Sequence, residues 1–138
     1  MKERVLELYD NGHNCAQSLI CAHGERFGLS PEQSWALGGP FGGGIGRSTK
    51  HICGAISGAL VIIGLAFPVD KNSVIESKKL MNSKTNQLVS DLGKKYPSFN
   101  CIDILRGNNA KPASMHSEVC KKILTDVCEI LDTLLTVG

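Results

Sequence analysis

Residues 52–67 read ICGAISGALVIIGLAF and form the longest apolar run of this 138-residue chain. Glycines and a serine interrupt the run, and it is shorter than the ~20 residues that a membrane-spanning helix needs. It also lacks the sustained alternation of apolar and polar residues that is typical of a half-buried strand. We therefore expect a buried central helix over about 52–67 and no membrane span.

The sequence on either side of this run carries the start and stop signals of further helices. The helices expected from these signals cover residues 2–10, 15–27, 31–37, 71–92, 101–105 and 117–135, with a loop over 107–112. The expected buried stripe of the longest one consists of Val74, Met81, Leu88 and Leu92. The chain is therefore predicted to be all-α, a compact single-domain multi-helix bundle over residues 1–138, built around the helix at 52–67.

Four of the six cysteines fall at or near expected helix starts: Cys15, Cys53, Cys101 and Cys120. Asn14 can cap the helix that begins at Cys15, with Gln17 as the reciprocal partner in a capping box. Asn100 can likewise cap the helix that begins at Cys101, with Asp103 as the acidic residue three positions later. Cys53 opens the central apolar run, and the candidate caps for the helix that carries Cys120 are Ser114 and Ser117.

A thiol in the first turn of a helix faces unpaired backbone N–H groups and the positive end of the helix dipole. Both favour the thiolate and can lower a cysteine pKa from ~8.5 to roughly 3.5–7.5. Basic side chains near two of the cysteines would add to this effect if they turn inward: Arg47, Lys50 and His51 near Cys53, and His13 near Cys15. By contrast, Cys21 and Cys128 lie in mid-helix and are expected to be packed, inert side chains.

A glycine-rich loop over residues 38–46 precedes the central helix. The glycines expected to border the cysteine site or a bound group are Gly42, Gly43, Gly44, Gly54 and Gly58. Tight helix packing is the alternative explanation for the last two, which share one helix face. The loop lacks the spacing of a Walker A motif, and no strand precedes it as in a dinucleotide-binding unit. No nucleotide cofactor is therefore expected.

The composition of the chain limits the kinds of molecule that we expect it to bind and the compartment in which we expect it. The formal net charge is +2, no long basic stripe is present, and aromatic residues are few, so nucleic acid is not an expected partner. The first residues, MKER, do not resemble a secretory signal, and a cytoplasmic location is therefore expected. In a reducing compartment, six cysteines are better explained by metal binding or redox catalysis than by a structural disulfide framework.

Several short segments, taken in order, carry a family resemblance: NCAQS at 14–18, FGGG at 41–44, CGAISG at 53–58, and then Cys101 and Cys120. They resemble the C_GCAxxG_C_C family of redox-active proteins. The family pattern includes the same four cysteines and omits Cys21 and Cys128. The resemblance implies redox chemistry without naming a substrate. A similar domain occurs beside an iron–sulfur centre in some haem proteins, so a cluster or another metal is an implied cofactor. Covalent haem is not expected, because no Cys-x-x-Cys-His motif is present.

The first functional hypothesis is that the four cysteines converge on one redox site of an oxidoreductase or electron-transfer protein with an unknown redox partner. This site would be a zinc or iron–sulfur centre held by all four thiolates, or a set of thiols for disulfide exchange with Cys15 or Cys53 as nucleophile. The second hypothesis is a non-catalytic binding protein with packed cysteines, whose glycine loop contacts a partner or a second copy of the chain. A third hypothesis pairs a cysteine with His13, His51 or His116 in hydrolysis or group transfer.

Overall fold

The computed structural model describes residues 1–107 and 118–136. Within these ranges the chain is helical, with no strand beyond one isolated antiparallel bridge between Ile52 and Asn100. The α-helices are α1 (Lys2–Asp10), α2 (Cys15–Gly24), α3 (Pro31–Gly38), α4 (Gly54–Ala66), α5 (Val74–Gly93), α6 (Cys101–Gly107) and α7 (Glu118–Thr136). Two short 3₁₀ helices, η1 (Glu25–Phe27) and η2 (Gly39–Phe41), follow α2 and α3. The all-α prediction is confirmed.

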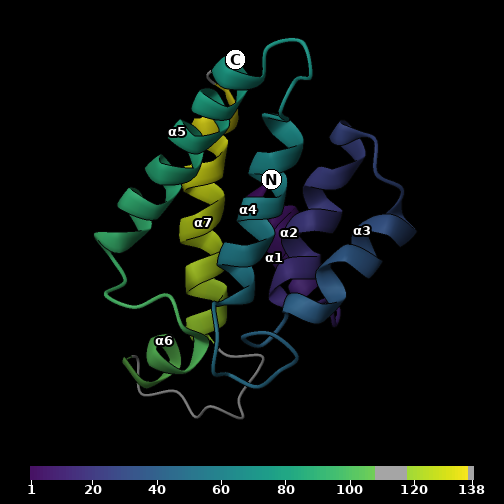
Figure 1. Ribbon diagram of the computed structural model, residues 1–138. Helices are drawn as coiled ribbons and strands as arrows, with labels where there is room; N and C mark the ends of the chain where they lie inside the picture. Colours follow the sequence, from purple (N-terminus) through teal and green to yellow (C-terminus); the bar gives the residue numbers. More distant parts are fainter. Residues whose placement is uncertain (108–117, 137–138) are drawn as a thin grey trace.

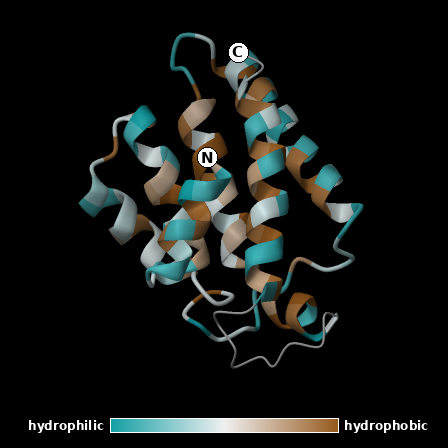
Figure 2. Ribbon diagram, turned by 180° about the vertical axis from the view of Figure 1, so that it is seen from behind, coloured by the Kyte–Doolittle hydropathy of each residue, from teal (hydrophilic) through white to brown (hydrophobic). Residues whose placement is uncertain are grey.

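Helix α4 is the predicted central helix, and it packs against α2, α5 and α7 (Figure 1). Its buried residues include Ile56, Ile62 and Ile63, which are at most 1% exposed. The amphipathic helix α7 covers α4 with an apolar side that includes Leu124 and Leu131, while its polar residues face outward (Figure 2). The core thus lies between α4 and the helices around it. None of the described helices is both long enough and apolar enough to cross a membrane.

Local signals explain most helix boundaries. Ser30 and Gln33 form a capping box at the start of α3, where Pro31 takes the first helical position. Gly28 follows η1 with φ of 87°, a left-handed conformation that glycine adopts easily. The predicted second helix therefore ends as a 3₁₀ turn rather than as continuous α-helix.

The predicted stripe of α5 is only partly correct. Leu88 and Leu92 are fully buried and Met81 is partly buried, as expected. Val74 is 41% exposed, because only the C-terminal part of the helix reaches the core. The predicted loop over 107–112, the candidate caps Ser114 and Ser117, and His116 lie outside the described residues, apart from Gly107.

The arrangement places several helix starts together. Helices α2, α4 and α7 all begin at the lower end of the molecule in Figure 1, beside α6. The four family cysteines stand at these starts: Cys15 is the first residue of α2, Cys53 precedes α4, Cys101 begins α6 and Cys120 is the third residue of α7. The helix starts therefore bring the four family cysteines to one end of the bundle.

Candidate functional site

The sulfurs of the four family cysteines lie close enough to influence one another. The thiol of Cys15 is hydrogen-bonded to that of Cys120, and the charges of Cys53 and Cys101 also act on Cys15. Cys53 in turn interacts with Cys101 and Cys120. All four side chains are buried, with 6–8% of each residue exposed. Residues that are far apart in the sequence thus form one cluster, which we call the four-thiol cluster.

Backbone hydrogen bonds bring Cys53 and Cys101 together. The N–H of Cys53 donates to the carbonyl of Phe99 over 2.8 Å, and the N–H of Cys101 donates to that of His51 over 2.8 Å. These bonds flank the bridge between Ile52 and Asn100. The segment before α4 and the segment before α6 therefore run side by side, and each delivers one cysteine.

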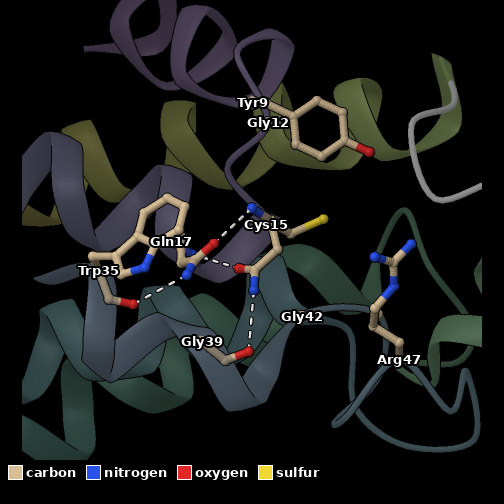
Figure 3. A pocket seen from close by; sticks show the side chains of 10 residues that line it. Tyr9, Gly12, Cys15, Gln17, Trp35, Gly39, Gly42 and Arg47 are labelled. Carbon is tan, nitrogen blue, oxygen red and sulfur yellow. Dashed lines mark hydrogen bonds between the residues drawn. The ribbon is translucent and has the colours of Figure 1, made fainter.

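The capping box predicted at Cys15 is present and has a wider role than a cap. Asn14 accepts a hydrogen bond from the N–H of Gln17 over 2.8 Å, and Gln17 accepts one from the N–H of Asn14 over 3.0 Å. The Asn14 amide also donates to the carbonyl of Gly39, and the Gln17 amide donates to the carbonyl of Trp35 (Figure 3). The start of α2 is thereby fastened to α3 and to the loop that follows it, which fixes the position of Cys15.

The expectation of low thiol pKa values is wrong for Cys15, Cys53 and Cys101. Burial raises the pKa of Cys53 to about 12, although backbone N–H groups of Ala55 and Ile56 oppose the shift. Burial and the charge of Cys120 raise the pKa of Cys101 to about 11. The hydrogen bond with Cys120, burial and the other sulfurs hold the pKa of Cys15 well above its ordinary value. Helix-start donors do act on Cys53, but the loss of water and the mutual repulsion of four thiolates outweigh them.

Glycines allow backbone to approach this cluster closely. A Cβ atom added to Gly44 would lie 2.7 Å from Cβ of Cys101, and one added to Gly54 would lie 3.3 Å from Cβ of Cys15. A Cβ atom at Gly42 would overlap the side chain of Asn14. These three glycines therefore sit against the cluster or its scaffold. Gly58 instead meets the backbone of Ala16 at 3.1 Å, which matches the helix-packing alternative.

The loop between η2 and α4 has a left-handed backbone. Residues 43–47 have consecutive positive φ values between 59° and 72°, and Thr49 has φ of 63°. Glycine tolerates this conformation, whereas Ile45 and Arg47 adopt it at a cost of about 1–2 kcal/mol each. Hydrogen bonds from the N–H of Thr49 to the carbonyl of Gly43 and from Gly46 to Pro40, both 2.8 Å, hold the turn closed.

A pocket of about 200 Å³ opens beside Cys15. Its lining also includes Tyr9, Gly12, Asn14, Gln17, Trp35, Gly39, Gly42, Gly43 and Arg47. Figure 3 shows the Cys15 sulfur, the Tyr9 hydroxyl and the Arg47 guanidinium facing the same space. Among the described residues, Cys15 is the member of the four-thiol cluster that lines this pocket. An incoming molecule would therefore meet Cys15 first.

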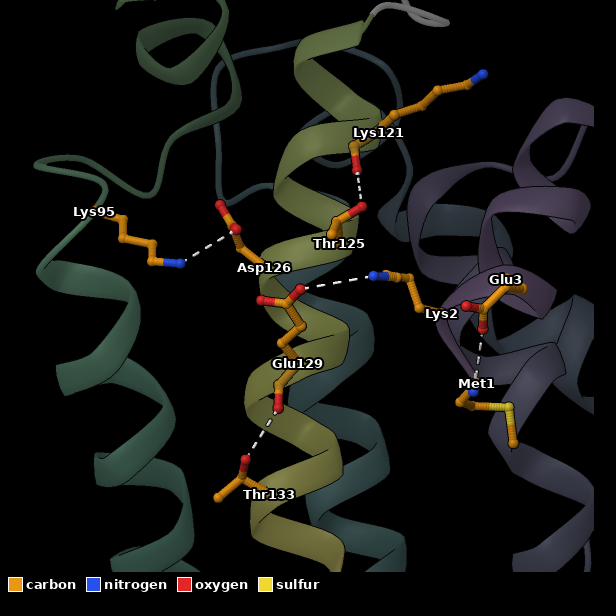
Figure 4. A network of polar contacts seen from close by, with 9 residues as sticks. All are labelled: Met1, Lys2, Glu3, Lys95, Lys121, Thr125, Asp126, Glu129 and Thr133. Atoms are coloured by element: carbon orange, nitrogen blue, oxygen red, sulfur yellow. Dashed lines mark hydrogen bonds and ion pairs between the residues drawn. The ribbon is translucent and has the colours of Figure 1, made fainter.

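A polar group that the sequence did not predict lies next to the four-thiol cluster. The hydroxyl of Tyr96 donates to the carboxylate of Asp126 over 2.6 Å. The ammonium of Lys95 lies 3.3 Å from the same carboxylate (Figure 4). Burial, the bond to Asp126 and the nearby Cys53 raise the pKa of Tyr96. No motif marks these residues, because they come from α7 and from the turn after α5 and meet only through folding.

The basic residues near the cluster and the two remaining cysteines agree only in part with the predictions made for them. His13 stacks edge-on against Trp35, with ring centroids 4.8 Å apart, and lines a different pocket together with Cys21. Arg47, Lys50 and His51 are all exposed. Of the three, Arg47 lines the pocket beside Cys15. Cys128 is fully buried in the core, as predicted. Cys21 is only partly buried, so its prediction as a packed core residue is wrong.

The four cysteines have the right ligand atoms for a metal centre, but their positions do not fit one. Four thiols would suit zinc or an iron–sulfur cluster. Over residues 1–107 and 118–136, however, no group of three or more His, Cys, Asp or Glu side chains has a geometry that could hold a metal ion. All six cysteines are free thiols in this structure.

Comparison with known proteins leads to a family. The model of the family described as "Putative redox-active protein (C_GCAxxG_C_C)" matches residues 13–134. No curated protein and no solved structure matches the chain. Because the match includes all four clustered cysteines and nearly the whole chain, this protein belongs to the C_GCAxxG_C_C family.

Proposed function

We propose that the protein is a thiol–disulfide oxidoreductase that works through its four-thiol cluster. In this proposal Cys15 attacks the substrate and Cys120 resolves the intermediate. The observation that carries the proposal is the hydrogen bond between these two thiols, combined with the place of Cys15 in the lining of an open pocket. Cys53 and Cys101 form a second pair that can accept the oxidised state from the first.

The chemistry balances as two successive exchanges. The Cys15 thiolate attacks one sulfur of a substrate disulfide, a Cys15–substrate bond forms, and the other half leaves as a thiol carrying the proton from Cys15. Cys120 then attacks the Cys15 sulfur and releases the second half as a thiol with the proton from Cys120. The protein dithiol loses two electrons and two protons, and the substrate disulfide gains them. An external dithiol would return the protein to its starting state.

The raised thiol pKa values bear on the rate of this reaction. Only a small fraction of Cys15 is thiolate at neutral pH, so attack on an ordinary disulfide is slow there and accelerates as the pH rises. A buried thiol of high pKa is on the other hand a strong nucleophile once it has ionised. Cys15 therefore suits a substrate that binds in the pocket and stays next to the sulfur.

The decisive experiment compares two double variants that are matched in position. Cys15→Ala/Cys120→Ala removes the proposed pair, and Cys21→Ala/Cys128→Ala removes one thiol from each of the same two helices, outside the cluster. Each reduced protein is treated with 2-hydroxyethyl disulfide without oxygen, and the products are mapped by peptide mass spectrometry. We expect a Cys15–Cys120 disulfide in the native chain and in the control, and none in the first variant. Oxidation that spares Cys15 and Cys120 in the native chain would refute the proposal.

A second candidate function is a metal or iron–sulfur centre with four cysteine ligands. The donor set of four buried thiols favours it, although the arrangement of the described residues does not fit a metal ion. Cys15, Cys53, Cys101 and Cys120 would hold the metal, with Gly42, Gly43, Gly44 and Gly54 bordering it and Gly58 further along α4. A cluster would supply one-electron transfer when bound. Metal analysis and visible absorption of protein purified without oxygen separate the two candidates: a colourless protein with free, oxidisable thiols supports exchange.

The binding-protein hypothesis predicts a different result for the same two double variants. If the four cysteines only fill space, Cys15→Ala/Cys120→Ala changes stability by the packing energy of the lost atoms and leaves the redox behaviour of the protein unchanged. A loss of disulfide formation confined to this variant therefore speaks against that hypothesis. A homo-oligomer remains compatible with both functions.

A further inference from the structure

The charged side chain in the lining of the pocket beside Cys15 is positive. Arg47 is the charged residue among the described residues that line it, and no acidic side chain stands with it there. The two polar amides of the lining are committed elsewhere, since Asn14 donates to the carbonyl of Gly39 and Gln17 to that of Trp35. The pocket therefore offers one strong charged donor group, the guanidinium of Arg47.

The guanidinium of Arg47 is directed at the pocket and not at a carboxylate of the protein. Among the ion pairs of residues 1–107 and 118–136, none involves Arg47. Figure 3 shows its side chain extending from the loop toward the space that the Cys15 sulfur also faces. An arginine fork is matched in shape to a carboxylate, with which it can form two parallel hydrogen bonds.

The backbone conformation of Arg47 also indicates that this residue serves the pocket. Arg47 has φ of 59° in a run of left-handed residues, and its N–H donates to the carbonyl of Gly42 over 3.0 Å. Glycine would occupy this position without strain, so stability alone does not explain an arginine there. The strained turn aims the side chain at the pocket.

We infer that the pocket binds a small disulfide that carries a carboxylate, which Arg47 holds while Cys15 attacks the adjacent sulfur. The inference rests on the proposed function, and it adds the class of substrate. In the first exchange the Cys15–sulfur bond forms, the ligand's own disulfide bond breaks, and the departing half leaves as a thiol with the proton from Cys15. The ligand disulfide is the oxidant. A volume of about 200 Å³ accommodates a molecule of this size, whereas a folded protein substrate would reach Cys15 only through an extended segment.

The test uses three symmetric disulfides of similar length and different charge: dithiodipropionate, 2-hydroxyethyl disulfide and cystamine, which are anionic, neutral and cationic. The rate of Cys15 modification in the 138-residue chain is measured for each disulfide. This rate is divided by the rate at which the same disulfide reacts with 1-thioglycerol, a neutral thiol that differs from the halves of all three disulfides, to remove differences in intrinsic reactivity. We expect dithiodipropionate to react roughly tenfold faster than cystamine at low ionic strength, and we expect salt to reduce the preference.

Three variants assign the preference to one side chain. Arg47→Gly fits the left-handed backbone, so it should fold normally and lose the preference for the anion. Arg47→Lys should retain part of the preference, because the charge remains but the fork is lost. Lys50→Ala, in the same loop but outside the pocket lining, should behave as the native chain.

The outcomes separate this inference from the proposed function. Equal corrected rates for the three disulfides, or an anion preference that survives in Arg47→Gly, would overturn the inference while leaving exchange at Cys15 intact. Failure of all three disulfides to modify Cys15 would overturn both. A preference that disappears only in the Arg47 variants supports the carboxylate-bearing substrate.

Discussion

Gly44 and Gly46 form a matched pair that tests whether the glycine loop is shaped by the four-thiol cluster. Both have left-handed backbones, with φ of 72° and 61°. A Cβ atom at Gly44 would lie 2.7 Å from Cβ of Cys101 and 3.1 Å from the carbonyl oxygen of His51, whereas one at Gly46 would meet nothing within 4 Å. Alanine at either position incurs about 1–2 kcal/mol of backbone strain. Only at Gly44 does it also crowd a packed region, which typically costs about 1–3 kcal/mol.

We therefore expect Gly44→Ala to lower the free energy of unfolding by about 1–3 kcal/mol more than Gly46→Ala does. The effect of alanine on the entropy of the unfolded chain is similar at both sites and cancels in the comparison. Urea unfolding followed by far-ultraviolet circular dichroism measures both free energies, and an unchanged m-value shows that the unfolded states are comparable. Equal losses in the two variants would refute the close packing of the loop against Cys101.

The buried thiols and the Tyr96 hydrogen bond give three more tests. Above about pH 9 the unfolded chain loses thiol protons that folded Cys53 retains up to about pH 12 and folded Cys101 up to about pH 11. The free energy of unfolding should therefore fall by about 1.4 kcal/mol per pH unit for each thiol within its window, as measured by urea unfolding at stepped pH. A stability that does not fall over this range contradicts the burial argument. Tyr96→Phe removes the bond to the buried carboxylate of Asp126 and should destabilise the protein by about 1–3 kcal/mol in the same assay, whereas Lys95→Ala, at a more exposed contact, should cost less than about 1 kcal/mol. Iodoacetamide at pH 8 should alkylate partly exposed Cys21 before any member of the cluster, and faster labelling of Cys53 in a mass-mapped time course would contradict its burial and raised pKa.

Much of the local structure follows from the amino-acid sequence alone. The cap Asn14 starts α2 as predicted, α3 begins at the predicted residue 31, and the apolar run at 52–67 becomes the central helix α4. These features depend on residues within one or two turns of each other, so they can be predicted without the rest of the chain. The family pattern likewise singled out the cysteines that cluster.

The properties of the site, in contrast, depend on how the helices pack. The gathering of four sulfurs depends on the pairing of the segments before α4 and α6, and on the packing of α2 and α7 against α4. Burial in that cluster reversed the direction expected for the thiol pKa values, because desolvation depends on everything that surrounds a sulfur and not on its helix position alone. The approach of Arg47 to Cys15 and of Tyr96 to Cys53 has the same origin. Side chains from distant parts of the chain meet only when the helices pack, and no local pattern records that meeting.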